Sequence, residues 1–402
     1  MNLPTLLLVL TIASCVFWLV ACWCVREFAR ERSAVRSHFS PPVSVLKPVS
    51  GLDHQAYANF RSFCEQDYPG YEILFGMQNA DDPVLPVLDR LRREFPHLNI
   101  QVVTAEPMGA NEKVSNLQAM VSAAHHDILV LSDSDMRVTP DYLRQVVEPL
   151  GDESNGLVTC LYRGEEATSL ASAFEALYDG STYMPEATVA ARLIRLPVAF
   201  GSTMALRRKD LERIGGFAAI MDYLADDYEL AARIMGLGKR VVLAPYVVPN
   251  ILGAESWRQV WNREVRWVRC IRASRPLEYP GLLLSFTLPL AIATATVMGF
   301  DVVGRNLIVM ALLVRWGTAW LISGYLGDTL MRRMLPWLPL RDLMTFAVWC
   351  AGVVSRDVEW RGRRFRVQAD GRLQPLVARP LGQHRPADVE KSRGPLTGRK
   401  HT

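Results

Sequence analysis

The chain has 402 residues, half of them hydrophobic, and 45 Lys and Arg residues nearly balance 41 Asp and Glu residues. The formal net charge of +4 gives no global field that would favour nucleic acid as the partner. Seven cysteines form neither a repeated CxxC zinc pattern nor a disulfide framework. The mean hydropathy of +0.09 is high for a soluble protein. Composition therefore argues against a nucleic-acid-binding protein and against a secreted disulfide-rich one.

Residues 1–25 predict an N-terminal membrane anchor. Leu3–Val25 holds 23 uncharged residues, and at ~1.5 Å rise per residue a helix of this length crosses the ~30 Å hydrocarbon layer. No Lys or Arg precedes the run and no small-residue cleavage site closes it, which disfavours a signal peptide. Arg26, Arg30 and Arg36 follow, and basic flanks prefer the cytoplasmic side. We expect the middle of the chain to be cytoplasmic.

Residues 40–275 predict one α/β domain, because short apolar runs alternate with longer amphipathic stretches. The expected strands are Val43–Leu46, Glu72–Met77, Ile100–Val103 and Ile128–Ser132, and the expected helices include Ala56–Glu65, Pro83–Phe95 and Leu230–Met235. This order favours a largely parallel sheet. No GxGxxG follows the first strand and no P-loop occurs, so a dinucleotide-binding protein is disfavoured.

Residues 281–354 predict a C-terminal membrane region of two spans and one shorter segment. Gly281–Phe300 is uncharged, whereas Asn306–Gly327 contains Arg315, which needs a partner, headgroups or a cavity at that depth. Leu343–Val354 has only 12 residues, which suits a re-entrant or interfacial segment better than a crossing.

Residues 355–402 predict a basic cytoplasmic tail. Arg356–Arg366 contains Trp360 and Phe365, and it suits either binding to anionic headgroups or a solvated charge run. Gln383–Thr402 is polar and contains prolines, so we expect it to be disordered.

The most informative motif is a pair of carboxylates after the strand that begins at Ile128. Asp133 and Asp135 are separated by one residue, and residues i and i+2 of an extended chain point to the same side. Ligands of open α/β sheets bind at the carboxyl ends of the parallel strands. Two carboxylates there suit a divalent cation that takes its other oxygens from a diphosphate. An Asx turn with a solvated second aspartate is the structural alternative.

Two further acidic clusters stand before predicted helices. Asp82 precedes Pro83, which fits a helix N-cap but also a strand-end contact to a base or ribose. Asp226 and Asp227 are adjacent carboxylates, whose repulsion can raise the pKa of one of them and make it a general base. Capping of the following helix is the alternative. Gly201, upstream, allows close approach of the backbone to a neighbouring group.

The last motif is Arg263-Glu-Val-Arg266-Trp267, within an amphipathic stretch that begins near Trp257. The i, i+3 spacing places both guanidiniums on one helical face, where they can hold a diphosphate. Trp267 offers a flat wall to a sugar or a lipid. A membrane-surface helix with snorkelling arginines gives the same pattern.

The order of these motifs resembles the inverting glycosyltransferases with a GT-A fold, and more narrowly the ceramide glucosyltransferase branch and the hopanoid-biosynthesis-associated glycosyltransferases of bacteria. The segments that carry the resemblance are Val45–Pro48, Gly51–Leu52, Gln66–Pro69, Lys113–Leu117, Ser132–Asp135, Gly156–Tyr162, Leu224–Tyr228 and Arg263–Trp267. They extend over about residues 3–366.

The resemblance implies a GT-A domain, Rossmann-like with a mostly parallel sheet, between N-terminal and C-terminal transmembrane helices of a multi-pass protein of the cell inner membrane. It implies transfer of a sugar from a UDP-sugar to a lipid hydroxyl, with UDP-N-acetylglucosamine and a hopanoid, or UDP-glucose and ceramide, as the pairs. Asp82 would contact the uridine, and Lys113 and Asn116 would lie near the nucleotide. Asp133 and Asp135 would hold Mg2+ or Mn2+.

The same resemblance implies that Asp227 is the general base, and that Arg263, Arg266 and Trp267 face the diphosphate and the acceptor. Ceramide enzymes usually carry Glu at the position of Asp226, so which aspartate of the pair is the base stays open. The other functions to consider are a nucleotidyltransferase with the same strand-end carboxylates and a non-catalytic lipid-binding scaffold. A polysaccharide synthase is disfavoured because two to four spans leave little material for a polymer channel.

Overall fold

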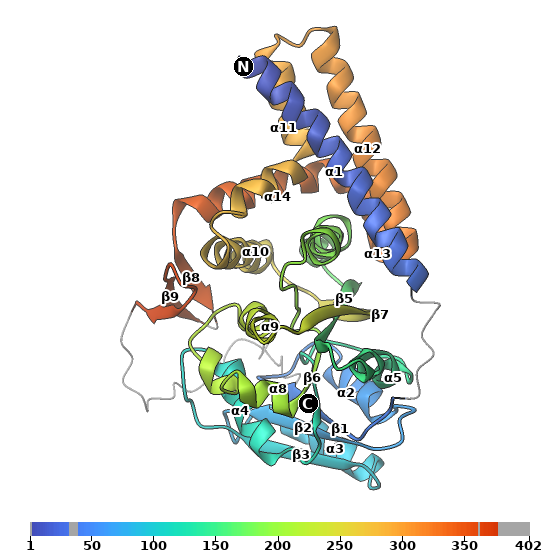
Figure 1. Cartoon of the computed structure of the whole chain (residues 1–402), viewed down its shortest axis with the longest axis vertical. Helices are drawn as coiled ribbons and strands as arrows, with labels where there is room; N and C mark the ends of the chain where they lie inside the picture. The colour runs from blue at the N-terminus through green and yellow to red at the C-terminus, as the bar shows by residue number, and fades with distance from the viewer. Residues whose placement is uncertain (1, 32–38, 361, 377–402) are drawn as a thin grey trace, which may run out of the picture.

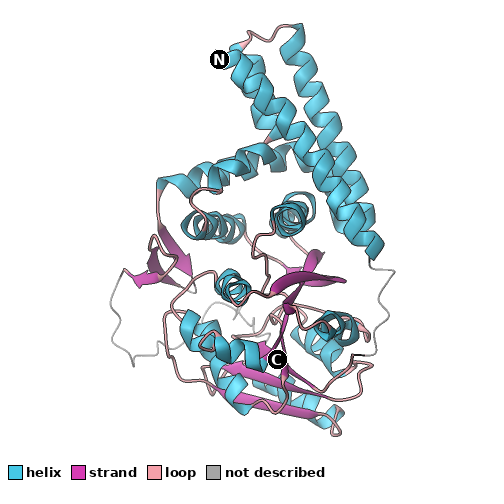
Figure 2. Ribbon diagram, viewed as in Figure 1, coloured by secondary structure: helices cyan, strands magenta, loops and turns pink. Residues whose placement is uncertain are grey.

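The computed structural model describes residues 2–31, 39–360 and 362–376, and at its centre is a seven-stranded sheet (Figures 1 and 2). The strands are β1 (Val43–Pro48), β2 (Tyr71–Met77), β3 (Asn99–Thr104), β4 (Ile128–Leu131), β5 (Asn155–Ala167), β6 (Met204–Arg207) and β7 (Arg240–Gly253). Their order is β3-β2-β1-β4-β6-β5-β7, and within this sheet β6 alone runs antiparallel to its neighbours. The predicted α/β class and mostly parallel sheet are confirmed.

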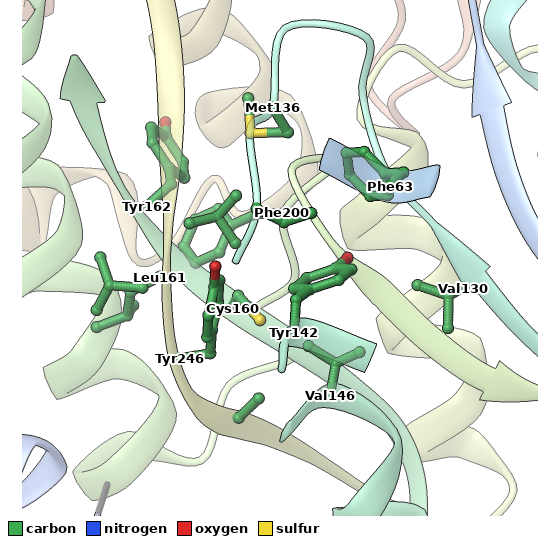
Figure 3. Close-up of a cluster of buried hydrophobic side chains, with 14 of the residues drawn as sticks. Phe63, Val130, Met136, Tyr142, Val146, Cys160, Leu161, Tyr162, Phe200 and Tyr246 are labelled. Atoms are coloured by element: carbon green, nitrogen blue, oxygen red, sulfur yellow. The ribbon is translucent and has the colours of Figure 1, made fainter. Parts of the chain in front are cut away.

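Helices cover both faces of the sheet. They are α2 (Ala56–Cys64), α3 (Leu85–Glu94), α4 (Glu112–Ala123), α5 (Tyr142–Val147), α6 (Leu170–Tyr178), α7 (Met184–Val189), α8 (Arg208–Arg213), α9 (Asp226–Gly236) and α10 (Trp257–Ser274). Val43 and Val45 of β1 pack into one core with α2, α3 and α5, whereas Leu46 packs into a second core with α4, α8 and α9. Figure 3 shows part of the first core, around Tyr142. Burial on both faces explains why these strands are continuous apolar runs.

Two helices begin away from their expected positions. α3 begins at Leu85, because the backbone around Asp82 forms a turn in which the Asp82 carbonyl accepts from the Leu85 N–H. α9 begins at Asp226, four residues before the expected start at Leu230, so both aspartates of the pair lie in its first turn. Carboxylates are stabilised there by the positive end of the helix dipole.

Apolar helices form the membrane region: α1 (Leu3–Glu31), α11 (Thr287–Val297), α12 (Val302–Leu326), α13 (Thr329–Met334) and α14 (Leu338–Val354). Among the described residues, α1, α12 and the segment Thr329–Val354 are long and apolar enough to cross a membrane. The span expected over residues 281–300 is interrupted, because a short helix at Tyr279–Ser285 meets α11 at a bend of 79°. Figure 1 shows α1, α11 and α12 side by side.

α14 contains the short apolar run that was expected to be re-entrant or interfacial. The helix is 17 residues long, and it lies across the sheet domain next to α10 rather than along α1 and α12 (Figure 1). Whether it crosses or lies on the bilayer stays a prediction, as do the boundaries of the membrane region.

Arg315, which lies within α12, has the partner that its position requires. The side chain is 2% exposed, and its guanidinium donates to both carboxylate oxygens of Asp342 on α14, at 2.9 and 3.0 Å. It also lies 3.6 Å from the ring centroid of Trp18 on α1. An ion pair and a cation–π contact compensate the burial of this charge. Arg315 therefore joins three helices of the membrane region.

The C-terminal segment forms a second sheet instead of a solvated basic tail. Its strands β8 (Asp357–Trp360), β9 (Arg363–Val367) and β10 (Leu373–Pro375) are antiparallel. Val358, Phe365 and Val367 form a small core with Leu224, which precedes α9. The arginines of this segment alternate with buried apolar residues, a period of two that predicts a strand. Gln383–Thr402, expected to be disordered, lies outside the described residues.

Replacing Asp342 by Ala should destabilise the full-length protein in detergent by about 3–5 kcal/mol, because it removes the carboxylate that accepts two hydrogen bonds from the buried Arg315 guanidinium. The double variant Arg315→Met/Asp342→Leu removes both charges and should be as stable as the native chain. Denaturant unfolding of the detergent-solubilised protein measures both. An unchanged midpoint for Asp342→Ala would show that the pair does not hold the helices together.

Candidate active site

The carboxyl ends of β1, β2 and β4 meet at one edge of the sheet, and the chain places polar side chains there. Asp53 follows β1, Asp82 follows β2, and Asp133 and Asp135 follow β4. Gly201 lies just before β6, whose antiparallel direction brings its start to the same edge. Asp82, Asp133 and Asp135 therefore lie at the carboxyl end of the sheet, as their positions after apolar strands predicted, and Asp53 and Gly201 lie there too.

Lys113 is the centre of this cluster. It lies in the first turn of α4, and its ammonium is 2.7 Å from the Asp133 carboxylate and 3.6 Å from the Asp226 carboxylate. Asn111 fixes the start of α4, because its side chain accepts from the Val114 N–H and donates to the Tyr223 carbonyl. The lysine thus joins the carboxylates after β4 to those at the start of α9.

Burial and neighbouring charges shift the pKa values of these groups. Burial opposes the charged form of Lys113, but the carboxylates of Asp133 and Asp226 outweigh it and raise its pKa. Burial, and then the charge of Asp226, raise the pKa of Asp227 to about 7. The pKa of Asp227 is therefore close to that of a free histidine side chain. The charges of Lys113 and Asp133 also influence this pKa.

Asp135 has the features of a cation ligand. Its Oδ1 is buried and makes no hydrogen bond, and burial, followed by the charges of Asp133 and Asp53, raises its pKa to about 7. A divalent cation would satisfy that oxygen and favour its ionised form. Among the described residues, no three His, Cys, Asp or Glu side chains gather as a metal cage. Two carboxylates from this chain, with the remaining oxygens from a diphosphate and water, fit Mg2+ or Mn2+.

Two charged groups at this edge, Lys47 and Asp53, were not among the predicted site residues. Lys47 of β1 is fully buried, and its ammonium donates to the Asp133 carbonyl at 2.8 Å and lies 3.6 Å from the centroid of the Phe63 ring. Burial lowers its pKa to about 7. Asp53 accepts a hydrogen bond from Ser134, between the two aspartates of the β4 pair. A lysine inside an apolar strand was the available hint for Lys47.

Two residues expected to lie near the nucleotide, Asp82 after β2 and Asn116 within α4, lie beside the carboxyl end of β2. Asp82 is buried, and its carboxylate accepts from the backbone N–H of Gly51 at 2.9 Å and of Val84 at 3.0 Å. It therefore fixes the β1 loop as well as the turn before α3. Asn116 of α4 donates to the Gly76 carbonyl, while its Oδ1 is buried without a hydrogen-bond partner.

The arginines of the α10 motif have different partners although they share a helix. Arg263 forms ion pairs with Glu175, at 2.5 Å, and with Glu255, so two carboxylates already occupy its guanidinium. The expectation was that Arg263 faces a diphosphate, whereas the structure pairs it with Glu255, eight positions before it, and with Glu175, 88 positions before it. Arg266 lies over the ring of Trp360 in β8, at 5.7 Å from its centroid.

Trp267 lies near the α9 aspartates. Its ring stacks on Tyr183, with centroids 5.8 Å apart and an interplanar angle of 11°, and Tyr183 stacks in turn on Tyr178. Burial, and then the charge of Asp227, raise the pKa of Tyr183. The middle ring of this stack, Tyr183, is thus close enough to Asp227 for the two groups to interact electrostatically, and the stack joins α10 to the end of α6.

The C-terminal sheet holds the loop that carries the α9 aspartates. The Leu373 N–H donates to the Asp222 carbonyl at 2.7 Å, and Tyr223 and Arg372 form a β-bridge. Arg363 pairs with Glu112, next to Lys113, at 3.4 Å. Residues 357–375 thus fix both segments whose charges meet at Lys113, a role that the predicted tail did not include.

Fold and site together define a GT-A-type glycosyltransferase. A mannosyltransferase from Pyrobaculum calidifontis, solved in complex with GDP-Man and Mn2+, matches with a TM-score of 0.53 at 19% identity, over 88% of this chain and 99% of that one. The chain matches glycosyl transferase family 21 over residues 6–373, and it belongs to this family. The protein is therefore a sugar-transferring enzyme, which removes the scaffold and nucleotidyltransferase alternatives.

Curated relatives include ceramide glucosyltransferases. Ceramide glucosyltransferase 3 of Caenorhabditis elegans is 24% identical over 350 residues, which are 83% of this chain and 74% of the relative. The ceramide glucosyltransferase of Komagataella phaffii is 30% identical over 158 residues, 37% of this chain and 31% of the relative. The predicted ceramide glucosyltransferase-like family is confirmed.

Gly201→Ala should slow sugar transfer about 100-fold while the protein stays folded. A Cβ at this position would lie 2.5 Å from both Asp133 Oδ2 and Lys113 Nζ, so the ion pair must move, but both atoms end mobile side chains. Transfer rates and thermal unfolding measure the two effects. Gly236→Ala is the matched control, because its Cβ has no atom within 4 Å. Equal rates for both variants would contradict this role of Gly201.

Phe365→Ala should lower kcat more than it changes the KM for the donor. The side chain is buried against the core that includes Leu224, and its loss costs about 3–5 kcal/mol of local packing, which frees the loop before Asp226. Steady-state kinetics separate kcat from KM. Gln374→Ala, at an exposed position of β10, is the control, and a Phe365→Ala variant with native kcat would show that the sheet does not position the loop.

Proposed function

We propose that this glycosyltransferase moves a sugar from a UDP-sugar to a hydroxyl of a membrane lipid, with inversion at the anomeric carbon. The observation that carries the proposal is the position of the Lys113 ammonium between Asp133 and Asp226. Asp133 is next but one to Asp135, which suits a cation, and Asp226 is next to Asp227, which suits the acceptance of a proton. We infer from the shared contact to Lys113 that both carboxylate pairs belong to one site.

The donor would bind along the carboxyl edge of the sheet. Asp82 would meet the uridine, with Lys113 and Asn116 near the nucleotide, and the unpaired Oδ1 of Asn116 supports this assignment. Asp135, aided by Asp133, would hold Mg2+ or Mn2+ at the diphosphate, where the cation would neutralise charge on the departing UDP. Mn2+ in the solved mannosyltransferase supports the same choice.

Asp227 would act as the general base. Its carboxylate removes the proton of the acceptor hydroxyl, whose oxygen forms a bond to the anomeric carbon as the bond from that carbon to UDP breaks. UDP leaves with the bonding electrons, and attack from the opposite face inverts the configuration. A pKa near 7 suits proton transfer at neutral pH. Arg266 and Trp267 would lie on the acceptor side, while the ion pairs of Arg263 hold α10 against α6 and the loop before it.

The apolar helices would keep the enzyme beside an acceptor that stays in the bilayer. We propose a multi-pass protein of the inner membrane with a cytoplasmic catalytic domain, supported by Arg26 and Arg30 after the first span and by the arginines of α10 before α11. Confinement to the membrane surface lowers the entropic cost of bringing the enzyme and the acceptor together, because both are already held at the same surface.

The donor and the acceptor can be identified by incubating membranes that contain the protein with labelled UDP-N-acetylglucosamine or UDP-glucose, each with a hopanoid polyol or ceramide. We favour UDP-N-acetylglucosamine and the hopanoid. The donor and acceptor pair that gives the highest rate of labelled glycolipid formation identifies the two substrates. Absence of lipid labelling with all four pairs, from membranes with folded protein, would contradict this donor and acceptor class.

Asp227→Asn should lower kcat by 10²–10⁴-fold, about the contribution of a general base. For the native enzyme, activity requires the ionised carboxylate, so kcat/KM should rise with pH up to about 7 and fall about tenfold per pH unit below it. If Asp227 had the pKa of an ordinary aspartate, kcat/KM would fall only below about pH 4. The acid limb of the pH profile, recorded at saturating metal, distinguishes the two cases.

Asp226→Asn distinguishes the two aspartates. It removes a like charge that raises the pKa of Asp227, so the acid limb should move to lower pH while turnover persists. Loss of turnover in Asp226→Asn together with native turnover in Asp227→Asn would assign the base to Asp226 instead.

Asp135→Asn should abolish the metal dependence of UDP affinity. The variant keeps the size of the side chain but removes the negative charge that a divalent cation requires. Titration of the purified protein with UDP, with and without Mn2+, measures this dependence, and Asp89→Asn, at an exposed position of α3, serves as the control. If Asp135→Asn retained the native Mn2+ effect, Asp135 would not be the ligand.

A further inference from the structure

A groove of ≈ 560 Å³ lies apart from the α9 aspartates, at the end of α10. It opens between the last turns of α10, the C-terminal end of α14, the short helix at Tyr279–Ser285 and strand β9. Ser355 and Arg356, which line it, belong to the segment that leaves α14 and turns to β8, and Figure 1 shows the path of this segment. We call it the interfacial groove. It borders both α14 and the bent helix pair of the membrane region.

Three arginines give the interfacial groove a positive lining. They are Arg269, Arg272 and Arg356, and no Asp or Glu is among the described residues that line it. Arg272 donates to the carbonyls of Gly352 at 2.8 Å and Val353 at 2.6 Å, which end α14. Carbonyls hold the guanidinium in position but carry no counter-charge. The groove is therefore preorganised for an anion.

Arg269 adds an unused donor to this lining. Its Nη1 donates to the Asp357 carbonyl, whereas its Nε is buried without a hydrogen-bond partner. The Asp357 carboxylate pairs with Arg366, on the other side of β8. Burial lowers the pKa of Arg269, and the Asp357 carboxylate opposes this shift only in part, while the positive charge of Arg272 adds to it.

Apolar and aromatic side chains beside the arginines place the interfacial groove at the depth of lipid headgroups. Leu277 is 89% exposed and Val354 is 85% exposed, and each adjoins a residue of the lining. Tyr279 and Trp349 line the groove, with rings stacked 5.5 Å apart. Tyrosine and tryptophan favour the membrane interface, and exposed leucine and valine at its rim favour acyl chains.

We propose that the interfacial groove binds the phosphate of an anionic membrane lipid, with Arg269, Arg272 and Arg356 around the phosphate and the acyl chains over Leu277 and Val354. Guanidiniums pair with phosphate oxygens through charge-assisted hydrogen bonds. The bound lipid would link α10, which carries Trp267, to α14. This site is separate from the donor site and does not depend on which sugar or acceptor the enzyme uses.

The test uses the detergent-solubilised full-length protein and three probes: dioctanoyl phosphatidylglycerol, dioctanoyl phosphatidylcholine and inorganic phosphate. We expect saturable binding of phosphatidylglycerol, at least tenfold weaker binding of phosphatidylcholine, and weaker binding of phosphate. Isothermal titration calorimetry gives the three affinities. Equal affinity for phosphatidylcholine, or phosphate binding as tight as that of phosphatidylglycerol, would overturn an anionic lipid site.

Charge-removing variants locate the site. Arg356→Gln changes an exposed side chain and should weaken phosphatidylglycerol binding about fivefold, and Arg272→Gln/Arg356→Gln should weaken it further. Arg258→Gln, at an exposed position in the first turn of the same helix, should have native affinity. Native affinity of Arg356→Gln, or an equal loss in Arg258→Gln, would overturn the assignment to this groove. Because the readout is lipid affinity, it is independent of sugar transfer.

Discussion

One buried ammonium organises the catalytic end of this protein. Lys113 contacts Asp133 after β4 and Asp226 at the start of α9, so it neutralises carboxylates from two segments that would otherwise repel one another. Its position depends on the Asn111 cap of α4 and on the absence of a side chain at Gly201. The lysine also opposes the rise in the pKa of Asp227 that burial and the charge of Asp226 cause, so that the pKa is about 7.

Buried ion pairs join the catalytic domain to the membrane helices. Arg341 of α14 pairs with Glu264 of α10 at 2.7 Å, and both side chains are almost fully buried. Asp342, the residue after Arg341, pairs in turn with Arg315 of α12, so α14 is joined to α10 and to α12. α10 also carries Trp267, which stacks toward Asp227, and the arginines of the interfacial groove. The helix is therefore in contact with the active site, the membrane helices and the proposed lipid site at once.

Sequence patterns predicted the features that depend on residues close together in the chain. The strand that begins at Ile128 and the carboxylates that follow it are such features, because alternation and strand ends are local properties. The ion pairs of Arg263 were missed because Glu175 lies 88 positions away. The sheet at residues 357–375 was missed although its arginines alternate with apolar residues as in a strand, because the basic charge suggested a tail and its core partner, Leu224, is far away in the chain. The resemblance supplied Lys113, whose two contacts are both long-range.

The claim that both carboxylate pairs share Lys113 can be tested by a double-mutant cycle. The free energy of unfolding is measured for Asp133→Asn, Asp226→Asn and the double variant in detergent. Residues that share a charged partner should be non-additive by about 0.5–3 kcal/mol, which is the result that a single site predicts. Additivity within about 0.3 kcal/mol would show that the two carboxylates act independently, and would contradict the single site.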